Sequence, residues 1–463
     1  MKHRMLAALA VAGITLGAAS TADAATWKRV TSATGGQSTD EVGLLRTDDN
    51  VLHVAWPLRS GDAYSVSHTV ISPSFQIGAT TPIVSGWAGT QSPALVQGAD
   101  GLRAFFGGQR STVTEDPNND LNTAVSPDGG ATWALQEGSI VPLGGQAYGS
   151  PVAATLGPDG QPIQTWAGTL GVWVHKGLLA TTPNVDLQGP FGPNGYYSNI
   201  ASAGGQTYVA WYSNGSQKGV LAQAIDANGN PSGSATVMPG TSGQTTDMGA
   251  RTPLVARAGG GFYAAYAAGD PTRNRVRLWK IGAGSSRTIA RTDGNTYVTV
   301  AAAEDGRLWV VWTDAVDGDA RVYATRSNEA ASRFGAIVDA GRPSGGTSVY
   351  SLNGSDAGGK LDLLANYSGN TTDASTWATR ILPGLTLKAN ATLSRSTTKS
   401  VRFTVTDAGD AVENAKVSIL GRSGRTDEDG RVTLRLQGSG TSKTATATMT
   451  GYTKATLKVR VTS

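Results

Sequence analysis

One phrase recurs along the chain: a tight turn of glycine or aspartate, then a β-rich segment that ends in an aromatic residue. The chain contains seven copies, and successive aromatic residues lie 45 to 60 residues apart. That period is the length of one four-stranded antiparallel sheet with its turns, and a single such sheet cannot bury both of its faces. Several copies must therefore pack against one another. The aromatic residues of the seven copies are Trp56, Phe106, Trp166, Trp211, Tyr266, Trp312 and Tyr367.

The sequence around each copy predicts further strands. One strand precedes the turn, as at residues 251–256, another follows the aromatic residue, as at residues 275–281, and a weaker fourth strand follows a second turn. Helical periodicity is almost absent. We therefore predict an all-β chain in which residues 25–384 form a seven-bladed β-propeller, with six blades as the alternative. The repeated aromatic residues are expected to pack between blades, and residues 26–31 to complete the last blade beside residues 374–382.

The segment Ser-Pro-Asp-Gly-Gly-Ala-Thr-Trp at residues 126–133 is similar to the Asp-box, or BNR motif, of the sialidase-like β-propellers, S-x-D-x-G-x-T-W. It matches at each specified position. In that family the motif joins the third and fourth strands of a blade on the face opposite the ligand, so the resemblance implies a structural role and no catalysis. The structural residues are Ser126, Asp128, Gly130, Thr132 and Trp133.

Residues 385–463 have a different character, because the repeat stops and Thr, Ser and Lys alternate with Val and Leu. This part resembles the Ig-like, carboxypeptidase-regulatory-like modules of secreted bacterial proteins, which implies a small β-sandwich that serves as a spacer or adhesion unit. Residues 386–463 hold 13 Lys and Arg against 6 Asp and Glu, a net charge of +7, while residues 25–385 carry −4. Such a charge attracts polyanions. An anionic cell surface is therefore an expected partner of this module, with a merely solvated surface as the alternative.

The N-terminus has the three parts of a secretory signal peptide. Lys2 and Arg4 precede an apolar run over residues 5–19, and the small residues Ala22 and Ala24 suit cleavage before Ala25. Residues 1–24 are thus expected to be removed and the mature chain to be extracellular and monomeric. No later apolar stretch is long enough to span a bilayer, so the mature chain is expected not to be transmembrane. The absence of cysteine excludes disulfides, thiolate metal sites and thiol nucleophiles.

The loops that enter each first strand and leave each second strand of such a propeller lie on one face, where ligands bind over the central channel. Tyrosines are frequent at these positions. Their amphipathic rings beside amides and carboxylates suit a sugar or a peptide, whereas packing in a narrow channel is the alternative. The predicted ligand-binding residues are Asp40, Glu41, Gln91, Arg110, Tyr148, Tyr196, Tyr197, Asp247, Arg251, Tyr297 and Tyr350.

The sequence leaves a catalytic role open and assigns no catalytic residue. A sialidase needs an arginine triad, a tyrosine nucleophile with a carboxylate partner and an aspartate acid, and the early Arg-Ile-Pro of that family is missing here. Arg110, Arg251 and Arg342 could form the triad only if they converge. A glycosidase that uses a pair of carboxylates is also left open, because the sequence cannot show whether two carboxylates converge. The predicted function is a secreted protein that binds a glycan or another extracellular polymer or protein, with a diverged sialidase-like hydrolase as the alternative.

No sequence motif indicates that the chain binds a cofactor or a nucleic acid. The chain lacks a phosphate-binding loop, a dinucleotide fingerprint and any nucleic-acid motif. Asp314, Asp317 and Asp319 have the spacing of calcium ligands, but the glutamate that completes such a loop is missing. A solvated hairpin turn is the preferred interpretation. We therefore expect no cofactor and no metal, calcium being the alternative.

Overall fold

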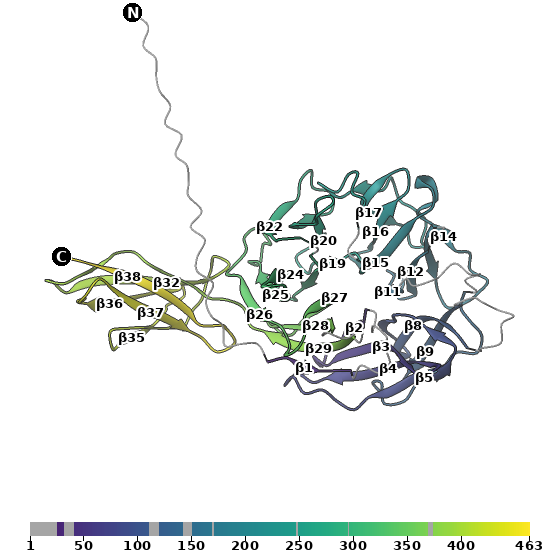
Figure 1. Ribbon diagram of the computed structural model, residues 1–463, viewed down its shortest axis with the longest axis horizontal. Coiled ribbons are helices and arrows are strands. Elements are labelled where there is room, and N and C mark those ends of the chain that lie inside the picture. Colours follow the sequence, from purple (N-terminus) through teal and green to yellow (C-terminus); the bar gives the residue numbers. More distant parts are fainter. Residues whose placement is uncertain are drawn as a thin grey trace, which may run out of the picture.

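The computed structural model describes residues 26–31, 41–110, 120–141, 151–168, 171–246, 249–294, 296–368 and 374–463 (Figure 1). The predictions for Asp40, Tyr148 and Asp247, and the signal peptide, fall outside these residues. The described chain is all-β, as predicted. Its one helical element is a short 3-10 turn, η1 (Gly189–Phe191). Among the described residues no helix has the length and apolarity needed to cross a membrane.

The described residues from 26 to 381 form seven antiparallel sheets, here called blades, one for each copy of the sequence repeat. The first strands of neighbouring blades contact one another in sequence and close a circle, with β27 against β2 (Figure 1). This arrangement is a β-propeller.

Blade 1 consists of β2 (Gly43–Arg46), β3 (Leu52–Ser60), β4 (Ala63–Ile71) and β5 (Thr81–Trp87); blade 2 of β6 (Gly89–Thr90), β7 (Ala94–Gly98), β8 (Gly101–Gln109), β9 (Asp120–Ser126) and β10 (Ala134–Leu135); blade 3 of β11 (Ala153–Leu156), β12 (Pro162–Gly168), β13 (Gly171–Lys176) and β14 (Val185–Asp186). Blade 4 consists of β15 (Gly195–Ala203), β16 (Gln206–Asn214), β17 (Lys218–Ile225) and β18 (Thr236–Val237); blade 5 of β19 (Leu254–Ala256), β20 (Phe262–Ala268), β21 (Arg275–Lys280) and β22 (Arg287–Arg291). Blade 6 consists of β23 (Val298–Ala302), β24 (Leu308–Val316), β25 (Asp319–Arg326) and β26 (Val338–Gly341); blade 7 of β27 (Ser348–Asp356), β28 (Leu361–Ser368), β29 (Ala374–Ile381) and β1 (Lys28–Arg29).

The N-terminal segment closes the ring. Strand β1 is the outermost strand of blade 7 and pairs antiparallel with β29, so that Lys28 faces Ala378 and Arg29 faces Trp377. Trp27 adds an edge-to-face contact with Tyr367, at 5.6 Å between ring centroids. The predicted pairing of residues 26–31 with the last blade is therefore confirmed. Blade 7, the last sheet of the ring, is therefore completed by residues from the N-terminal end of the propeller.

The seven repeated aromatic residues all lie on the second strand of a blade and are buried, with at most 3% of each residue exposed. They pack with apolar residues of the blade interfaces; Trp211, for example, lies in one cluster with Ile163 of blade 3. Fully burying side chains of this size supplies several kilocalories per mole each at about 25 cal/mol per Å². The prediction of a structural role for these residues is confirmed.

Two faces of the ring follow from the strand order. The face called the loop face carries the connections that leave second strands and those that run from one blade to the next; the face called the turn face carries the other connections. The turn at residues 126–133 joins β9 to β10, the third and fourth strands of blade 2, and so lies on the turn face.

The turn at residues 126–133 is held by its own polar side chains. Asp128 accepts hydrogen bonds from the amide and the hydroxyl of Thr132, at 2.8 and 2.6 Å, and from the hydroxyl of Ser126 at 2.8 Å. These bonds, that from the Thr132 hydroxyl first, lower the pKa of Asp128 to about 2. Gly130 has a φ of 91°, and a Cβ there would lie 2.1 Å from the His68 ring, so glycine alone fits.

A buried histidine pair lies beneath this turn. His53 Nδ1 and His68 Nε2 are 3.0 Å apart on neighbouring strands of blade 1, and the Trp133 ring stands edge-on against His68. Both histidines are nearly inaccessible to solvent, at 4% and 2% exposure. Burial, followed by the neighbouring His53, lowers the pKa of His68 to about 4. The pair is therefore neutral near pH 7 and connects blade 1 to blade 2.

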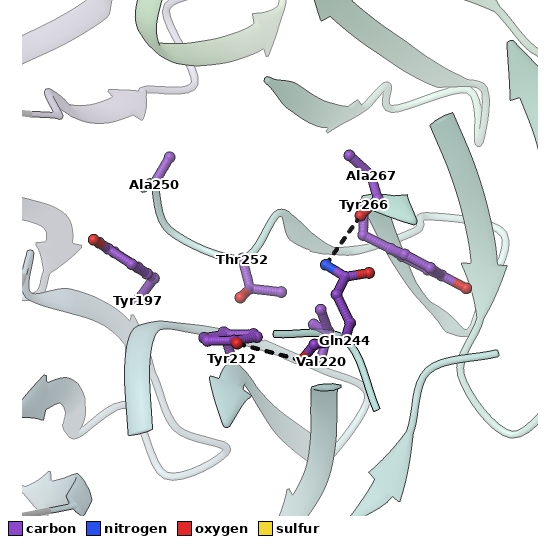
Figure 2. A pocket seen from close by; sticks show the side chains of 8 residues that line it. All are labelled: Tyr197, Tyr212, Val220, Gln244, Ala250, Thr252, Tyr266 and Ala267. Atoms are coloured by element: carbon purple, nitrogen blue, oxygen red, sulfur yellow. Dashed lines mark hydrogen bonds between the residues drawn. The ribbon is translucent and has the colours of Figure 1, made fainter. Parts of the chain in front are cut away.

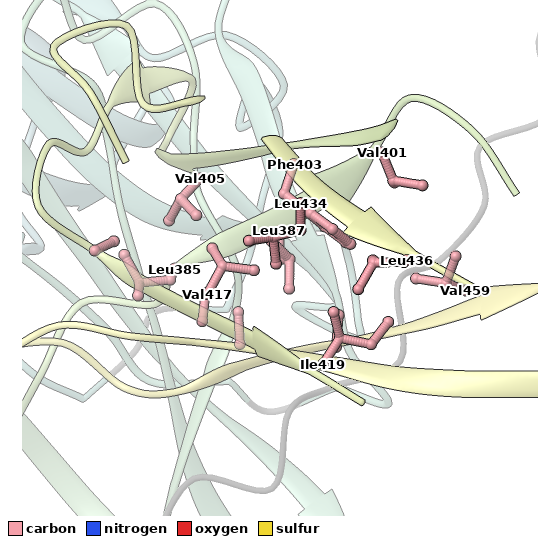
Figure 3. Packing of buried hydrophobic residues seen from close by; sticks show 14 of the residues in the cluster. Leu385, Leu387, Val401, Phe403, Val405, Val417, Ile419, Leu434, Leu436 and Val459 are labelled. Atoms are coloured by element: carbon pink, nitrogen blue, oxygen red, sulfur yellow. The ribbon is translucent and has the colours of Figure 1, made fainter. Parts of the chain in front are cut away.

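Strands β30 to β38 form a sandwich of two sheets, in which β31 and β38 run parallel. The small sheet contains β30 (Thr386–Ala389), β32 (Lys399–Asp407), β33 (Asp410–Ala411) and β36 (Arg431–Leu436); the large sheet contains β31 (Leu393–Ser394), β34 (Lys416–Ile419), β35 (Arg422–Arg425), β37 (Ser442–Thr448) and β38 (Ala455–Thr462). Figure 3 shows its own apolar core between the sheets, with Phe403, Val417 and Val459 among the buried residues. Figure 1 shows the sandwich projecting from one side of the ring beside β26.

The sandwich contacts the turn face of blade 6 through charged groups. Arg326, at the end of β25, donates to the buried carboxylate of Asp407. Arg307 pairs with Asp410 at 2.7 Å and lies 4.0 Å from Asp407. Breaking a buried ion pair by removing one partner is strongly destabilising because the other charge stays buried. The Asp407–Asp410 hairpin is thus fixed on the ring.

The Asp128→Ala variant is expected to melt at a lower temperature than the wild type, because the Thr132 amide and two hydroxyls lose their acceptor. Binding at the loop face should be unchanged, since the turn lies on the opposite face of blade 2. Asp128→Asn, which keeps one acceptor oxygen, should melt between the two. Calorimetry with a parallel binding assay checks this, and lost binding at an unaltered melting temperature would contradict the structural assignment.

The His68→Gln variant tests the histidine pair. An unfolded histidine titrates near pH 6.5 and folded His68 near 4, so the unfolded chain binds more protons between these values and stability falls as the pH drops through them. His68 alone should remove about 2 kcal/mol of unfolding free energy between pH 7 and pH 5. The variant should be less stable at pH 7 but lose less on acidification, as followed by denaturant unfolding. An equal loss in both proteins would show that other groups carry the acid sensitivity.

Candidate functional site

The middle of the ring is crossed by one arginine. Arg251, which precedes β19 of blade 5, donates to the carbonyls of Val42, Pro93 and Val152 at 3.1, 2.9 and 2.7 Å. Each of these carbonyls belongs to the residue just before β2, β7 or β11, in blades 1, 2 and 3. Its guanidinium therefore ties blade 5 to three blades across the channel.

Glu41 completes this central arrangement. Its Oε1 accepts a hydrogen bond from the backbone amide of Arg251 at 2.5 Å, and its Oε2 lies 3.4 Å from Nε of the same residue. The side chains of Glu41 and Arg251 are only 6% and 11% exposed. Both predicted residues thus lie at the channel, but the groups that were expected to bind a ligand bind each other and the ring's own backbone. We call these two residues the central pair.

A shallow pocket lies beside the central pair, on the loop face between blades 4 and 5 (Figure 2). Its cavity volume is about 10 Å³, room for about one water molecule. None of its lining residues is charged. Three of them are tyrosines, and an amide and a hydroxyl stand between the rings. The lining residues, here called the tyrosine pocket, are Tyr197, Tyr212, Val220, Gln244, Ala250, Thr252, Tyr266 and Ala267.

Hydrogen bonds hold the pocket in shape. The Tyr212 hydroxyl donates to the carbonyl of Gln244 at 3.3 Å, and the Gln244 amide donates to the carbonyls of Thr246 and Ala267 at 2.7 and 3.4 Å. The Thr252 amide donates to the carbonyl of Tyr197 at 2.9 Å, which joins the first strands of the two blades. The pocket is therefore preformed, which lowers the entropic cost of binding.

Backbone irregularity places Tyr197 in this pocket. The register of β15 against β16 shifts between Tyr196 and Asn199, and Tyr197 has a φ of 54°, a conformation uncommon for an aromatic residue. Such a bulge turns a side chain out of the alternating pattern of the strand and is frequent beside binding sites. Figure 2 shows Tyr197 to the left of Thr252 and Tyr212 below it.

A second bulge of the same kind carries another predicted tyrosine. The register of β27 against β28 shifts between Val349 and Ser351, and Tyr350 between them is 44% exposed. The Ser368 hydroxyl lies 3.3 Å from the Tyr350 hydroxyl. Blade 7 therefore also presents a tyrosine, outside the tyrosine pocket.

The other predicted tyrosines within the described residues, Tyr196 and Tyr297, are half-buried. Tyr196 stacks on Tyr212 at 6.2 Å, and its hydroxyl donates to the side chain of Asn194 at 3.2 Å. Tyr297 packs against the apolar clusters of blades 5, 6 and 7. These two rings support the blade interfaces beside the channel rather than lining the tyrosine pocket.

Arg110 of blade 2 and Arg342, which follows the last strand of blade 6, form hydrogen bonds with groups of the protein close to them. Arg110 donates to Asn122 at 3.0 Å and to two carbonyls of blade 2, and its guanidinium lies over the Trp87 ring. Arg342 donates to Asp319 and to the carbonyl of Gly346. Gln91 is buried, at 7% exposure. Among the partners that the described residues provide, Arg110, Arg251 and Arg342 have none in common.

The aspartates with calcium-like spacing occupy the hairpin between β24 and β25. Asp317 and Gly318 form its two-residue turn, with φ values of 53° and 85°. Asp314 accepts from the amides of Asp293 and Ala315, and Asp319 pairs with Arg342. In the part of the chain that the structure describes, no three His, Cys, Asp or Glu side chains gather closely enough to hold a metal ion.

Sequence reasoning missed several residues of the tyrosine pocket. Tyr212 lies directly after the repeated aromatic Trp211, at the end of the second strand, and this position could have been read from the repeat. Gln244 and Thr252 lie in the connection between blades 4 and 5. No pattern marks Gln244, because its role depends on which loop folds over the end of β16.

The sequence matches no known family profile, and no curated protein sequence resembles it. Among solved structures, an ulvan lyase of the polysaccharide lyase family PL25, bound to -[GlcA(1-4)Rha3S]-, is 10% identical, with 76% of this chain and 95% of that chain covered and a TM-score of 0.48. Trypanosoma rangeli sialidase in complex with the inhibitor DANA is also 10% identical, with coverages of 76% and 58% and a TM-score of 0.42. A prolyl endopeptidase is 16% identical, with coverages of 81% and 54% and a TM-score of 0.45. At these values the likeness carries no argument about what this chain binds or about its residues.

The central pair is expected to increase the free energy of unfolding. Replacing Arg251 by Met leaves the Glu41 carboxylate buried without its cation, and breaking a buried pair in this way removes about 3–5 kcal/mol of unfolding free energy. The double variant Arg251→Met/Glu41→Gln should recover part of that loss. Denaturant unfolding of the three proteins checks this. Normal stability of the single variant combined with lost ligand binding would instead assign Arg251 to the ligand.

Proposed function

We propose that this protein is a secreted β-propeller that binds a glycan through its loop face and does not cleave it. The proposal includes a removable signal peptide over residues 1–24, a propeller over residues 25–384 and an Ig-like sandwich over residues 385–463. The tyrosine pocket is the observation that carries it. The alternative ligands are a peptide and another extracellular polymer, and the binding test described below distinguishes them from a glycan.

The chemistry of the tyrosine pocket suits a sugar. The ring of Tyr197, which is half-buried while the other lining residues are buried, offers apolar surface to the C–H face of a pyranose ring. Beside it, the side-chain oxygen of Gln244 accepts no hydrogen bond within the described residues. The pocket lacks charged residues. A neutral sugar residue that packs on Tyr197 is therefore the favoured ligand, and the exposed Tyr350 on blade 7 offers further aromatic surface to a longer chain.

The contacts of the arginines support binding without hydrolysis. A sialidase-like mechanism requires three arginines that clamp one carboxylate, whereas Arg251 is committed to Glu41 and backbone carbonyls, Arg110 to blade 2 and Arg342 to Asp319. Preorganised donors aimed at a developing charge are the main requirement of such catalysis. The arrangement in this ring stabilises the fold instead.

A glycan array with a parallel readout of released sugars tests the proposal. The Tyr197→Ala variant should bind the selected glycan about tenfold more weakly, equivalent to about 1.4 kcal/mol, because one ring face is lost. Tyr197→Phe keeps that face and should bind nearly as the wild type does. Tyr64→Ala on β4, outside the tyrosine pocket, is the matched control.

The outcomes separate the alternatives. Equal weakening by Tyr197→Ala and Tyr64→Ala would remove the tyrosine pocket from recognition. Release of sugars by the wild type would replace the binding function with hydrolysis. Binding to peptides but to no glycan would reassign the ligand.

A further inference from the structure

The sandwich has an uneven charge distribution that its net charge does not reveal. Of the 6 acidic residues in residues 386–463, Asp407 and Asp410 are turned to the ring and pair with Arg326 and Arg307. The other 4 lie in loops, at Glu413 and at residues 427–429. The outward positions of the two sheets therefore carry bases and hydroxyls without acids.

The strand register brings four of the bases together on the small sheet. Lys388 of β30 and Arg431 of β36 both lie opposite Thr404 of β32. Arg402 lies opposite Thr433 on the same pair of strands. These side chains alternate with buried Val401, Phe403 and Val405 and so point away from the core.

The fourth base, Arg435, lies opposite Ser400 on the same face. All four bases are exposed. Arg431 pairs with Asp429 at 2.8 Å, whereas no ion pair engages Lys388, Arg402 or Arg435 within the described residues. We call the surface formed by Lys388, Arg402, Arg431 and Arg435 the cationic face.

We propose that the cationic face binds a linear acidic polysaccharide. Successive outward residues on one strand lie about 7 Å apart and neighbouring strands about 5 Å apart, so the bases form a flat array of positive charge. Hydroxyls of Ser400, Thr404 and Thr433 lie between the bases and can bond to sugar hydroxyls and carboxylates. A polymer that alternates anionic groups with hydroxyls matches both features.

The same surface is less suited to other polyanions. The sandwich contains two aromatic residues, Phe403 in the core and Tyr452 beside Arg326, so the cationic face lacks rings for stacking nucleic-acid bases. It also lacks the large apolar side chains that insert into a membrane surface. This proposal concerns the sandwich alone and does not depend on glycan binding by the tyrosine pocket.

Retention of the full-length chain on immobilised polygalacturonate, with neutral dextran as the reference matrix, tests the proposal. The wild type should be retained at low salt and released as salt rises, because contacts between exposed charges are screened. The triple variant Lys388→Gln/Arg402→Gln/Arg435→Gln should bind about tenfold more weakly, since each exposed ion pair contributes about a factor of two. The variant Arg402→Lys/Arg435→Lys keeps the charge and should largely retain binding.

A control variant on the large sheet removes the same charge elsewhere. Lys416, Lys458 and Arg460 point outward from that sheet, and their replacement by Gln should weaken binding much less. Equal weakening by the two triple variants would show that net charge, and not the cationic face, attracts the polymer. Retention insensitive to salt would also overturn the proposal.

Two further measurements make each outcome informative. Melting temperatures of all variants should match the wild type, and the charge-retaining variant gives an independent result if a triple variant is unstable. Tighter binding to vesicles of phosphatidylserine and phosphatidylcholine than to polygalacturonate would replace the polysaccharide with a membrane surface. The Tyr197→Ala variant should keep its salt-dependent retention, so failure of loop-face binding stays distinguishable from failure of this proposal.

Discussion

The contacts of the Arg251 guanidinium are the interaction on which the ring most depends. Seven sheets arranged in a circle leave a gap at the centre, where backbone carbonyls of the first strands converge. One planar cation with several donors can satisfy carbonyls of Val42, Pro93 and Val152 at once, and Glu41 neutralises its charge. A shorter or monodentate cation could not reach three blades. A side chain of the protein itself therefore links first strands across the ring.

In the proposed function, this contact places recognition away from the axis of the ring. Within the described residues, the tyrosine pocket lies between blades 4 and 5, and the bulge at Tyr197 forms part of its wall. The strain of a positive φ at an aromatic residue is tolerated because hydrogen bonds from neighbouring strands hold the segment. In the proposed function, binding and ring stability thus depend on different residues of one face.

The sandwich is fixed to the ring by charges that its sequence alone presents as surface charges. Asp407 and Asp410 flank a two-residue hairpin turn, and in isolation such a turn would be solvated. Docking on blade 6 buries Asp407 against Arg326. Cutting the chain near Pro383 would leave these groups unpaired, so experiments on the isolated parts would measure altered surfaces. The same docking removes acidic groups from the free surface and makes the remainder of the sandwich more basic.

The sequence by itself determined the all-β class, the repeat and the pairing of the N-terminal segment with the last blade, because local turns and alternating burial repeat with a fixed period. It also identified Trp211 and its equivalents as core residues and the 126–133 segment as a turn, since these depend on neighbours in sequence. Only the tertiary structure decided that Arg251 binds carbonyls of distant blades, that Arg110 and Arg342 do not join it, and that Gln244 helps to line a pocket. Those outcomes depend on which side chain reaches across 99 to 209 residues of chain, as from Arg251 to Val152 and Val42, and no local pattern encodes that distance.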